Sequence, residues 1–518
     1  MVIMDASHPE VIRARSKSAV KQILRHPLRS QLWEEDRLDC ESLVQNTPIF
    51  PALVAYAYIH RKLCRNERDP YTPIQKMIKY WNMKTTVSLL QMHDEIRDTL
   101  IGSPKSQACN GYCKYFLDGR TMHIADIEYT AATLSVCVTK SYASDEDHTQ
   151  FFGSRGGAAE SLIGLLRALM SAKSKCINER YKQGFTQALI KLARKSLQFD
   201  SGLRLRDVNL PEDFKFESLG ASSGIIKGEL AGRMVAVKIL INLHPEDRDS
   251  RKGFYQEMAV CLQLKHPNCV PFYGTYDVGG SLGIVTPWME KGSLRNYLDD
   301  PDTRNQFDHC IPFIWDIARG LEYLHGLDPH ITHCDLKPEN ILLTSNEHLC
   351  LADFGISNSS SSKVHVPTSR KQLESSGSLL YMAPDMLNIP SEQVQSIAPE
   401  CDVYSFGTIC FEIIAGSHPL SNFLPCSGED LRNHIMNQDV NFALPYNQLT
   451  RRRGYTGMGA LIQKMRKAKA KDRWTLQKCI ASLPLFNDLR PDGDPKFDTS
   501  FLVSYYIPVS DPFEVTSN

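Results

Sequence analysis

Residues 333–340 read His333-Cys334-Asp335-Leu336-Lys337-Pro338-Glu339-Asn340, and Asp353-Phe354-Gly355 follows them. Asp335 supplies a carboxylate that can orient a hydroxyl nucleophile, and Lys337 supplies a cation that can neutralise a transferring phosphoryl group. The Asn340 amide and the Asp353 carboxylate offer oxygen atoms, the ligands that Mg²⁺ prefers. The stretch therefore indicates a phosphotransfer site.

In this order and spacing, the two motifs resemble the catalytic loop and the metal-binding loop of the eukaryotic protein kinase superfamily. The resemblance implies that Asp335 and Lys337 act in catalysis, that Asn340 and Asp353 bind metal, and that ATP and Mg²⁺ are the cofactors. Cys334 stands where most members carry Arg. Because that Arg contacts a phosphate on the activation segment, its absence predicts regulation by partners or N-terminal elements. Redox sensing at Cys334 is a weaker alternative.

The bulk composition excludes few classes of protein. The 518 residues suggest two to four domains, and the balance of 59 Lys plus Arg against 59 Asp plus Glu gives no argument for nucleic acid. No apolar run is long enough for a membrane span, and the N-terminus lacks a secretory core. Fifteen scattered cysteines favour a reducing compartment, so a cytoplasmic protein is expected. A zinc site is the weaker alternative for four of the ligand-type residues, Cys109, Cys113, His123 and Cys137.

The first 205 residues divide into three predicted parts. Residues 1–30 form a basic arm, for which a solvated helix is favoured over membrane or mitochondrial targeting. Residues 31–155 form a module of unknown fold, in which residues 122–127 and 133–139 resemble strands. Residues 156–205 form two helices with apolar stripes, which suit docking or dimerisation. A regulatory protein partner is expected to bind through residues 31–205.

Residues 211–485 are expected to form the kinase domain, in an α+β bilobal fold with a small β-rich N-lobe and a larger α-helical C-lobe. The preceding region is expected to be mixed and largely helical, and residues 486–518 form a tail that is either disordered or packed back on a lobe. By resemblance, the nucleotide contacts Leu219, Gly220, Ser223, Gly224, Ile225, Ala236, Lys238, Thr286, Trp288, Met289 and Leu342.

The glycine-rich loop departs from the family pattern G-x-G-x-x-G. Counted without gaps from Lys238, Ser218 and Ser223 replace the first and third glycines, and Gly220 is the middle one. Glycines matter there because backbone amides must approach the phosphates closely. The loop alone is a weak signal, and the extra side chains are expected to weaken or retune nucleotide binding.

Lys238 ends the alternating strand Val235-Ala236-Val237, and a helix containing Glu257 follows. By resemblance, Glu257 pairs with Lys238, and this pairing aims the Lys238 ammonium at the α- and β-phosphates of ATP. Lys238 and Glu257 are therefore also expected to be catalytic residues. Two unrelated surface residues would be the plainer explanation for either one alone, but not for both in this order.

The two lobes are expected to join after the apolar strand at residues 282–285. By resemblance, Thr286 is the gatekeeper and residues 287–289 are the hinge that hydrogen-bonds adenine. The base is then expected to lie between Ile225, Ala236 and Leu342.

The segment from Asp353 to Asp385 is rich in serine, which favours a mobile lid that is either unmodified or autophosphorylated. It ends in Ala-Pro-Asp where the family has Ala-Pro-Glu, and Arg473 is the expected buried partner of Asp385. Asp402 is expected to brace the backbone of the catalytic loop.

Val-Ala-Val-Lys, the Thr gatekeeper and Asp402-Val403-Tyr404-Ser405-Phe406-Gly407 resemble the tyrosine-kinase-like group of Ser/Thr kinases. Lys337, two positions after Asp335, favours Ser or Thr as the acceptor in a protein substrate. The expected function is therefore phosphoryl transfer in intracellular signalling. The alternative is a pseudokinase scaffold, which the altered loop, Cys334 and Asp385 favour and the complete set of catalytic residues opposes. An interaction platform at residues 31–200 is compatible with either.

Overall fold

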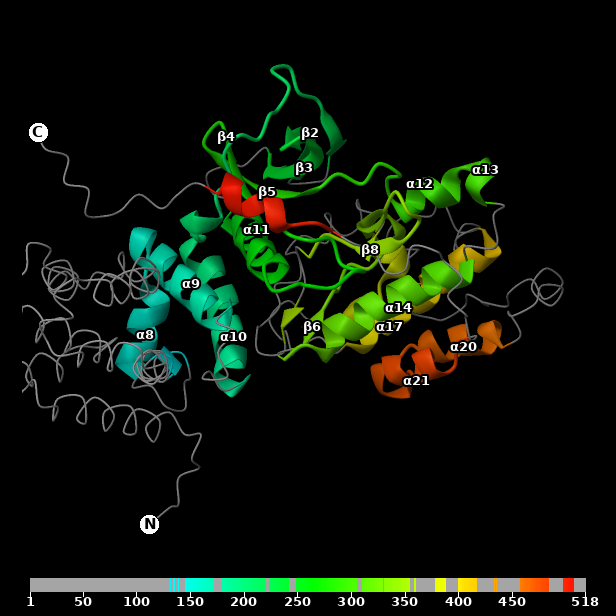
Figure 1. The fold of residues 1–518 in the computed structure, drawn as a ribbon. Coiled ribbons are helices and arrows are strands. Elements are labelled where there is room, and N and C mark those ends of the chain that lie inside the picture. Colours follow the sequence, from blue (N-terminus) through cyan, green and yellow to red (C-terminus); the bar gives the residue numbers. More distant parts are fainter. Residues whose placement is uncertain are drawn as a thin grey trace, which may run out of the picture. The chain divides into compact units, whose positions relative to one another are not determined.

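The structure is a computed structural model of the 518-residue chain. The residues it describes are 131, 134–135, 138, 145–171, 179–219, 223–241, 248–304, 310–328, 330–354, 358–359, 378–387, 399–416, 433, 435, 457–483 and 497–506. The basic arm, the four zinc-type residues, the strand predicted at 122–127 and Gly220 lie outside this set. The chain divides into two compact units, and the described parts of the second run from Leu203 to Tyr506 (Figure 1).

The first unit contains the helices α8 (Asp145–Gly153), α9 (Gly156–Ser171) and α10 (Glu179–Ser196). Helices α9 and α10 pack together, and most residues of the predicted apolar stripes are buried. The buried stripe residues are Leu162, Leu165, Leu166, Leu169, Phe185, Ala188, Leu189 and Leu192. The expectation of two amphipathic helices is therefore confirmed.

The strand predicted at residues 133–139 is wrong. Leu134 and Val138, with Ala131 and Ser135, are helical and buried. Their spacing of three, one and three residues is that of one helix face, and burial of this face outweighs the alternation of Leu134, Val136 and Val138.

The second unit begins with a five-stranded antiparallel sheet in the order β1-β2-β3-β5-β4. Its strands are β1 (Phe216–Leu219), β2 (Ser223–Leu230), β3 (Arg233–Leu240), β4 (Gly274–Val278) and β5 (Ser281–Pro287). Alternate residues of β2, β3 and β5 form a buried core, with Ile226, Val237 and Val285 fully enclosed. Helix α11 (Arg248–Cys261) contacts β3 and completes this small lobe.

The larger lobe is mainly helical, as expected (Figure 1). Its helices are α12 (Leu294–Asp299), α13 (Pro301–Arg304), α14 (Cys310–Gly326), α16 (Pro384–Leu387), α17 (Glu400–Ala415), α20 (Met458–Met465) and α21 (Leu476–Ala481). Two two-stranded antiparallel sheets pair β6 (Ile331–Thr332) with β9 (Asn358–Ser359) and β7 (Ile341–Leu343) with β8 (Leu349–Leu351). Residues 401–414 of α17 are all buried, which makes it the central helix. Among the described helices, none combines the length and apolarity needed to cross a bilayer.

Segments on both sides of the predicted 211–485 domain also pack on the sheet. The Leu205 N–H donates to Thr275 O at 2.7 Å on β4, and the Arg206 N–H donates to Tyr505 O at 2.8 Å. Leu502 is buried in the sheet core, and Arg233 pairs with Asp498 at 2.7 Å. Of the two expectations for the tail, packing on a lobe therefore holds for residues 497–506.

Candidate active site

The register of the sheet places four of the nucleotide-site residues on one face. Ile225 lies directly opposite Lys238, and Ala236 lies opposite Thr286. Directly opposed residues of an antiparallel pair share a face, and Ala236 and Lys238 share one because they are two positions apart. All four are half-buried, whereas the other face is the closed core. The open face of the sheet thus carries these predicted residues.

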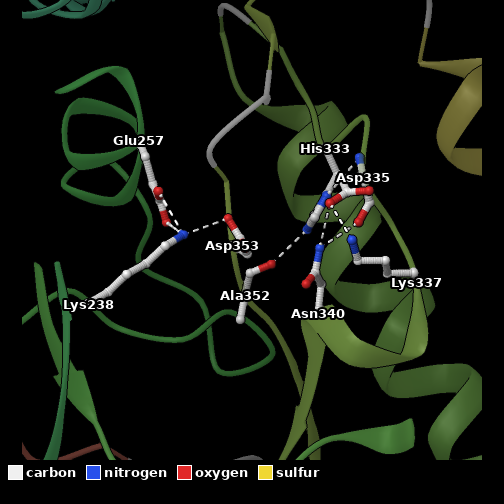
Figure 2. Close-up of polar contacts among 8 residues, drawn as sticks. All are labelled: Lys238, Glu257, His333, Asp335, Lys337, Asn340, Ala352 and Asp353. Carbon is white, nitrogen blue, oxygen red and sulfur yellow. Dashed lines mark hydrogen bonds and ion pairs between the residues drawn. The ribbon is translucent and has the colours of Figure 1, made fainter. Parts of the chain in front are cut away.

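Lys238 joins two carboxylates that come from different parts of the chain (Figure 2). Its Nζ donates to Glu257 Oε1 and Oε2 at 2.8 and 2.9 Å and to Asp353 Oδ1 at 2.8 Å. Glu257 belongs to α11, and Asp353 follows β8. The pairing expected between Lys238 and Glu257 is therefore present, and the same ammonium also reaches the predicted metal ligand.

The electrostatics of this trio are set by burial and by the shared cation. Burial opposes the charged form of Lys238, but Asp353 and Glu257 outweigh it and raise the pKa of the ammonium. Burial raises the pKa of Glu257 to about 7 against the opposing effect of Lys238. Burial also opposes ionisation of Asp353, but Lys238 and Lys337 outweigh it and lower its pKa to about 2. Asp353 therefore stays ionised and ready for a cation.

The catalytic-loop side chains converge on Asp335 (Figure 2). Asp335 Oδ2 accepts from Lys337 Nζ at 2.9 Å and from Asn340 Nδ2 at 3.0 Å. Asn340 Nδ2 also donates to Asp335 O at 2.9 Å, so the side chain closes the loop on itself. His333 lies beside this group, with Nε2 3.0 Å from Ala352 O, and so links the loop to the residue before Asp353.

Asp402 of α17 holds the backbone of the catalytic loop in place. Its carboxylate accepts from the His333 N–H at 2.8 Å and from the Cys334 N–H at 2.9 Å, and His325 Nε2 lies 2.8 Å away. Cys334 has a φ of 67°, in the left-handed region that residues with a side chain seldom adopt. The two backbone bonds stabilise this conformation, and the predicted bracing role of Asp402 is confirmed.

Comparison with known families decides what kind of site this is. A sequence model described as the protein kinase domain matches residues 219–483, just over half of the chain. The chain belongs to the protein kinase family. The family assignment and the two-lobed fold that followed from it are therefore confirmed.

Several curated kinases align with this kinase domain. Serine/threonine-protein kinase CTR1 of Arabidopsis thaliana is 33% identical over 223 residues, which are 42% of this chain and 25% of that protein. Serine/threonine-protein kinase VIK of the same plant is 33% identical over 211 residues, 40% of this chain and 46% of that protein. Dual specificity protein kinase shkC of Dictyostelium discoideum is 30% identical over 217 residues, 41% of each. The match thus spans less than half the length of each relative.

The predicted hinge, residues 287–289, is fixed to the sheet through Trp288, whose N–H donates to Met234 O at 3.0 Å. Met289 is buried against Val270 and Cys350, and Leu342 packs on the same cluster. The predicted hinge residue Met289 and the predicted floor residue Leu342 are therefore neighbours, although they are far apart in the sequence.

The predicted glycine-rich segment joins β1 to β2 in a hairpin. Leu219 pairs directly with Gly224, so only residues 220–223 lie between the paired positions. A Cβ on Gly224 would stand 2.4 Å from the Phe216 ring, so packing requires a glycine here. Leu219 is 65% exposed, and Ser223 is half-buried at the start of β2.

Asn340 and Asp353 offer a donor set that suits Mg²⁺. Because Asn340 Nδ2 is used by Asp335, the amide oxygen is directed away from that carboxylate. Among the described residues, His, Cys, Asp and Glu do not gather in a group of three that could hold an ion alone. Mg²⁺ in kinases is usually bound by one or two protein oxygens plus substrate phosphates, so the two residues fit that ion.

One group at the site was missed by the sequence interpretation. Arg295 of α12 lies beside the catalytic loop, with Nε 3.1 Å from Glu339 Oε1. It also donates to Glu412 and to the Tyr381 hydroxyl. No local motif marks Arg295, because its partners lie 44, 117 and 86 positions away along the chain.

The expected pair of Asp385 and Arg473 is present, with the Arg473 side chain fully enclosed.

Proposed function

We propose that the domain transfers the γ-phosphoryl group of ATP to Ser or Thr hydroxyls of protein substrates. The observation that carries this proposal is the convergence of Lys337 and Asn340 on Asp335, beside the chain formed by Glu257, Lys238 and Asp353. The proteins that it resembles include two serine/threonine kinases and one dual specificity kinase. The acceptor class therefore rests on both Lys337 and these relatives.

In this mechanism Asp335 orients the acceptor hydroxyl and receives its proton. Lys337 is held 2.9 Å from Asp335, so its ammonium lies where the transferring phosphoryl group would pass. Lys238 binds the α- and β-phosphates, and Glu257 keeps its ammonium in place. Asn340 and Asp353 hold Mg²⁺, which neutralises charge on the phosphates when bound. Positioning and charge neutralisation supply most of the catalysis, as in other phosphoryl transfers.

The open face of the sheet is proposed to cover adenine. Ile225 and Ala236 lie above the base, and Leu342 lies below it. Because the Trp288 N–H is bonded to Met234 O, the hinge hydrogen bonds to adenine are assigned to the Pro287 carbonyl and to Met289. Thr286 lies opposite Ala236 on the neighbouring strand, next to the proposed adenine site.

A scaffold that binds nucleotide without catalysis is the second candidate. It is favoured by the altered phosphate-covering motif, in which Ser218 and Ser223 replace the first and third glycines. The added side chains keep backbone amides farther from the phosphates, which lowers nucleotide affinity. The intact Asp335 cluster weighs against this candidate.

Incorporation of labelled phosphate into a generic Ser/Thr protein substrate tests the proposal. Asp335→Asn is expected to lower transfer by about 10³-fold or more, because it removes the group that accepts the proton. Asp213→Asn, the same change at an exposed residue before β1, serves as the control and keeps full transfer. If the native chain transfers nothing in the presence of Mg²⁺ but ATP still raises its melting temperature, the scaffold is the correct function.

A regulatory partner that binds within residues 31–205, a cytoplasmic location and a role in signalling are also proposed. The partner rests on Cys334, which stands where most family members carry a phosphate-binding Arg, and the location rests on the described cysteines, none of which forms a disulfide. A pull-down with residues 31–205 removed would lose such a partner.

A further inference from the structure

Arg295 occupies the centre of a second charged network beside the catalytic loop. Its Nε lies 3.1 Å from Glu339 Oε1, and its Nη1 lies 2.8 Å from Glu412 Oε1. Its Nη2 donates to the Tyr381 hydroxyl at 2.5 Å, and this hydroxyl donates to Glu412 Oε2 at 2.6 Å. All three guanidinium nitrogens are therefore engaged, in the fork geometry that Lys cannot reproduce.

The network is closed on the side of α17. The side chain of Glu412 is 3% exposed, so its charge needs a partner inside the protein. Burial opposes the charged form of Arg295, but its hydrogen bond to Glu412 together with the charges of Tyr381, Glu412 and Glu339 outweighs burial and raises the pKa of the guanidinium. Burial and Glu412 raise the pKa of Tyr381, so the hydroxyl keeps the proton that it donates. Arg295 therefore stays charged, and Tyr381 stays a hydrogen-bond donor.

The network connects three segments whose relative positions matter for the reaction: the catalytic loop, the end of the segment that begins at Asp353, and α17. Glu339 lies in the catalytic loop, one residue before Asn340. Tyr381 lies near the end of the segment that begins at Asp353, and its carbonyl also accepts from Ser405 Oγ at 2.8 Å. Glu412 and Ser405 both belong to α17. Arg295 therefore ties the end of this segment to the catalytic loop through α17.

Cys334 cannot supply a cation to the segment, whereas Arg295 reaches it from α12. In kinases, ordering of this segment commonly requires a new pair between an arginine and a phosphorylated residue. We propose that Arg295 is a positioning residue that holds the segment end, residues 378–387, against the catalytic loop without phosphorylation. The expected effect of Arg295 on phosphoryl transfer rests on the proposed kinase activity. Its expected effect on the position of residues 378–387 does not.

Hydrogen exchange of the dephosphorylated full chain provides the structural test. Residues 378–387 of the native protein are expected to be protected. Arg295→Met is expected to raise their exchange by about tenfold or more, because it removes the hydrogen bond to Tyr381 together with those to Glu339 and Glu412. Arg248→Met, at the exposed first residue of α11, is the matched control and leaves this exchange unchanged. Unchanged exchange in Arg295→Met overturns the proposal whether or not the chain is an active kinase.

Kinetics separate positioning from general stability. Arg295→Met is expected to lower kcat/KM for the protein substrate about tenfold while KM for ATP changes less than about twofold. Arg295→Lys restores part of the loss, and phosphatase treatment leaves the native rate unchanged. An equal rise in both KM values, or a native rate abolished by phosphatase, overturns the proposal.

Two further controls cover a variant that does not fold and a native chain that has no activity. If Arg295→Met does not fold, Tyr381→Phe removes only the bridging hydroxyl and is expected to produce the same changes at smaller size. If the native chain transfers no phosphate, the proposed function fails, and hydrogen exchange alone decides the role of Arg295.

Discussion

Two charged networks flank the catalytic loop, and they differ in what their cation joins. In the first, which we call the open network, Lys238 on the open face of the sheet is shared by Glu257 and Asp353, and the Asp353 side chain is 44% exposed. In the second, Arg295 is shared by Glu339, which is similarly exposed at 45%, by Tyr381 and by the enclosed Glu412 of α17. Lys238 and Asp353 can exchange each other for a phosphate and a metal ion, whereas Glu412 anchors Arg295 to α17. We therefore expect the first to bind phosphate and the second to hold architecture.

The largest effect is expected when the open network is broken. Lys238→Met removes the cation of the nucleotide phosphates and leaves Glu257 buried without its partner, so kcat/KM should fall by at least ~100-fold and the KM for ATP should rise. The same substitution at Arg295 spares the KM for ATP. Steady-state kinetics with varied ATP measure the difference.

Lys215→Met, at an exposed lysine just before β1, is the control for this change and should retain the native rate. A Lys238→Met rate within about threefold of the native rate would contradict the assignment of Lys238 to the phosphates.

An intermediate effect is expected where packing, not charge, holds the small lobe. Leu502→Ala in the C-terminal segment removes an apolar side chain that is 3% exposed, so the free energy of unfolding should fall by about 2–4 kcal/mol. Urea unfolding measures the change, and Ser504→Ala in the same segment is the exposed control. Equal midpoints for the two variants would show that the segment adds nothing to the stability of the lobe.

The smallest effect is a pH dependence confined to the open network. Because burial raises the pKa of Glu257 from 4.5 to about 7, its contribution to stability is complete below pH 4.5 and is lost as the pH rises toward 7. The free energy of unfolding should therefore fall with rising pH, by at most about 1.4 kcal/mol per pH unit from this group.

Glu257→Gln should remove that part of the slope, because the amide does not titrate. Urea unfolding between pH 5 and 8 compares the two proteins, and parallel curves would show that Glu257 titrates as in the unfolded chain.

Much of the candidate active site was predictable from sequence because its residues lie in motifs of fixed spacing. Asp335, Lys337 and Asn340 are close along the chain, so the loop that joins them brings them together locally. The pairing of Lys238 with Glu257 followed from the order of a strand and a helix. The strand expected at residues 133–139 failed because alternation over a short run cannot be distinguished from a helix face without knowledge of what covers it.

The sequence by itself determined the family, the two lobes and the residues that converge on Asp335, because these depend on short spacings and on residue types with specific chemistry. Only the tertiary structure decided that Arg295 meets Glu412, that residues 497–506 complete the small lobe, and that Gly224 packs under Phe216. Those contacts join positions brought together by burial and by strand register. Burial and strand register cannot be predicted from any local sequence pattern, because each depends on which surfaces the whole chain encloses.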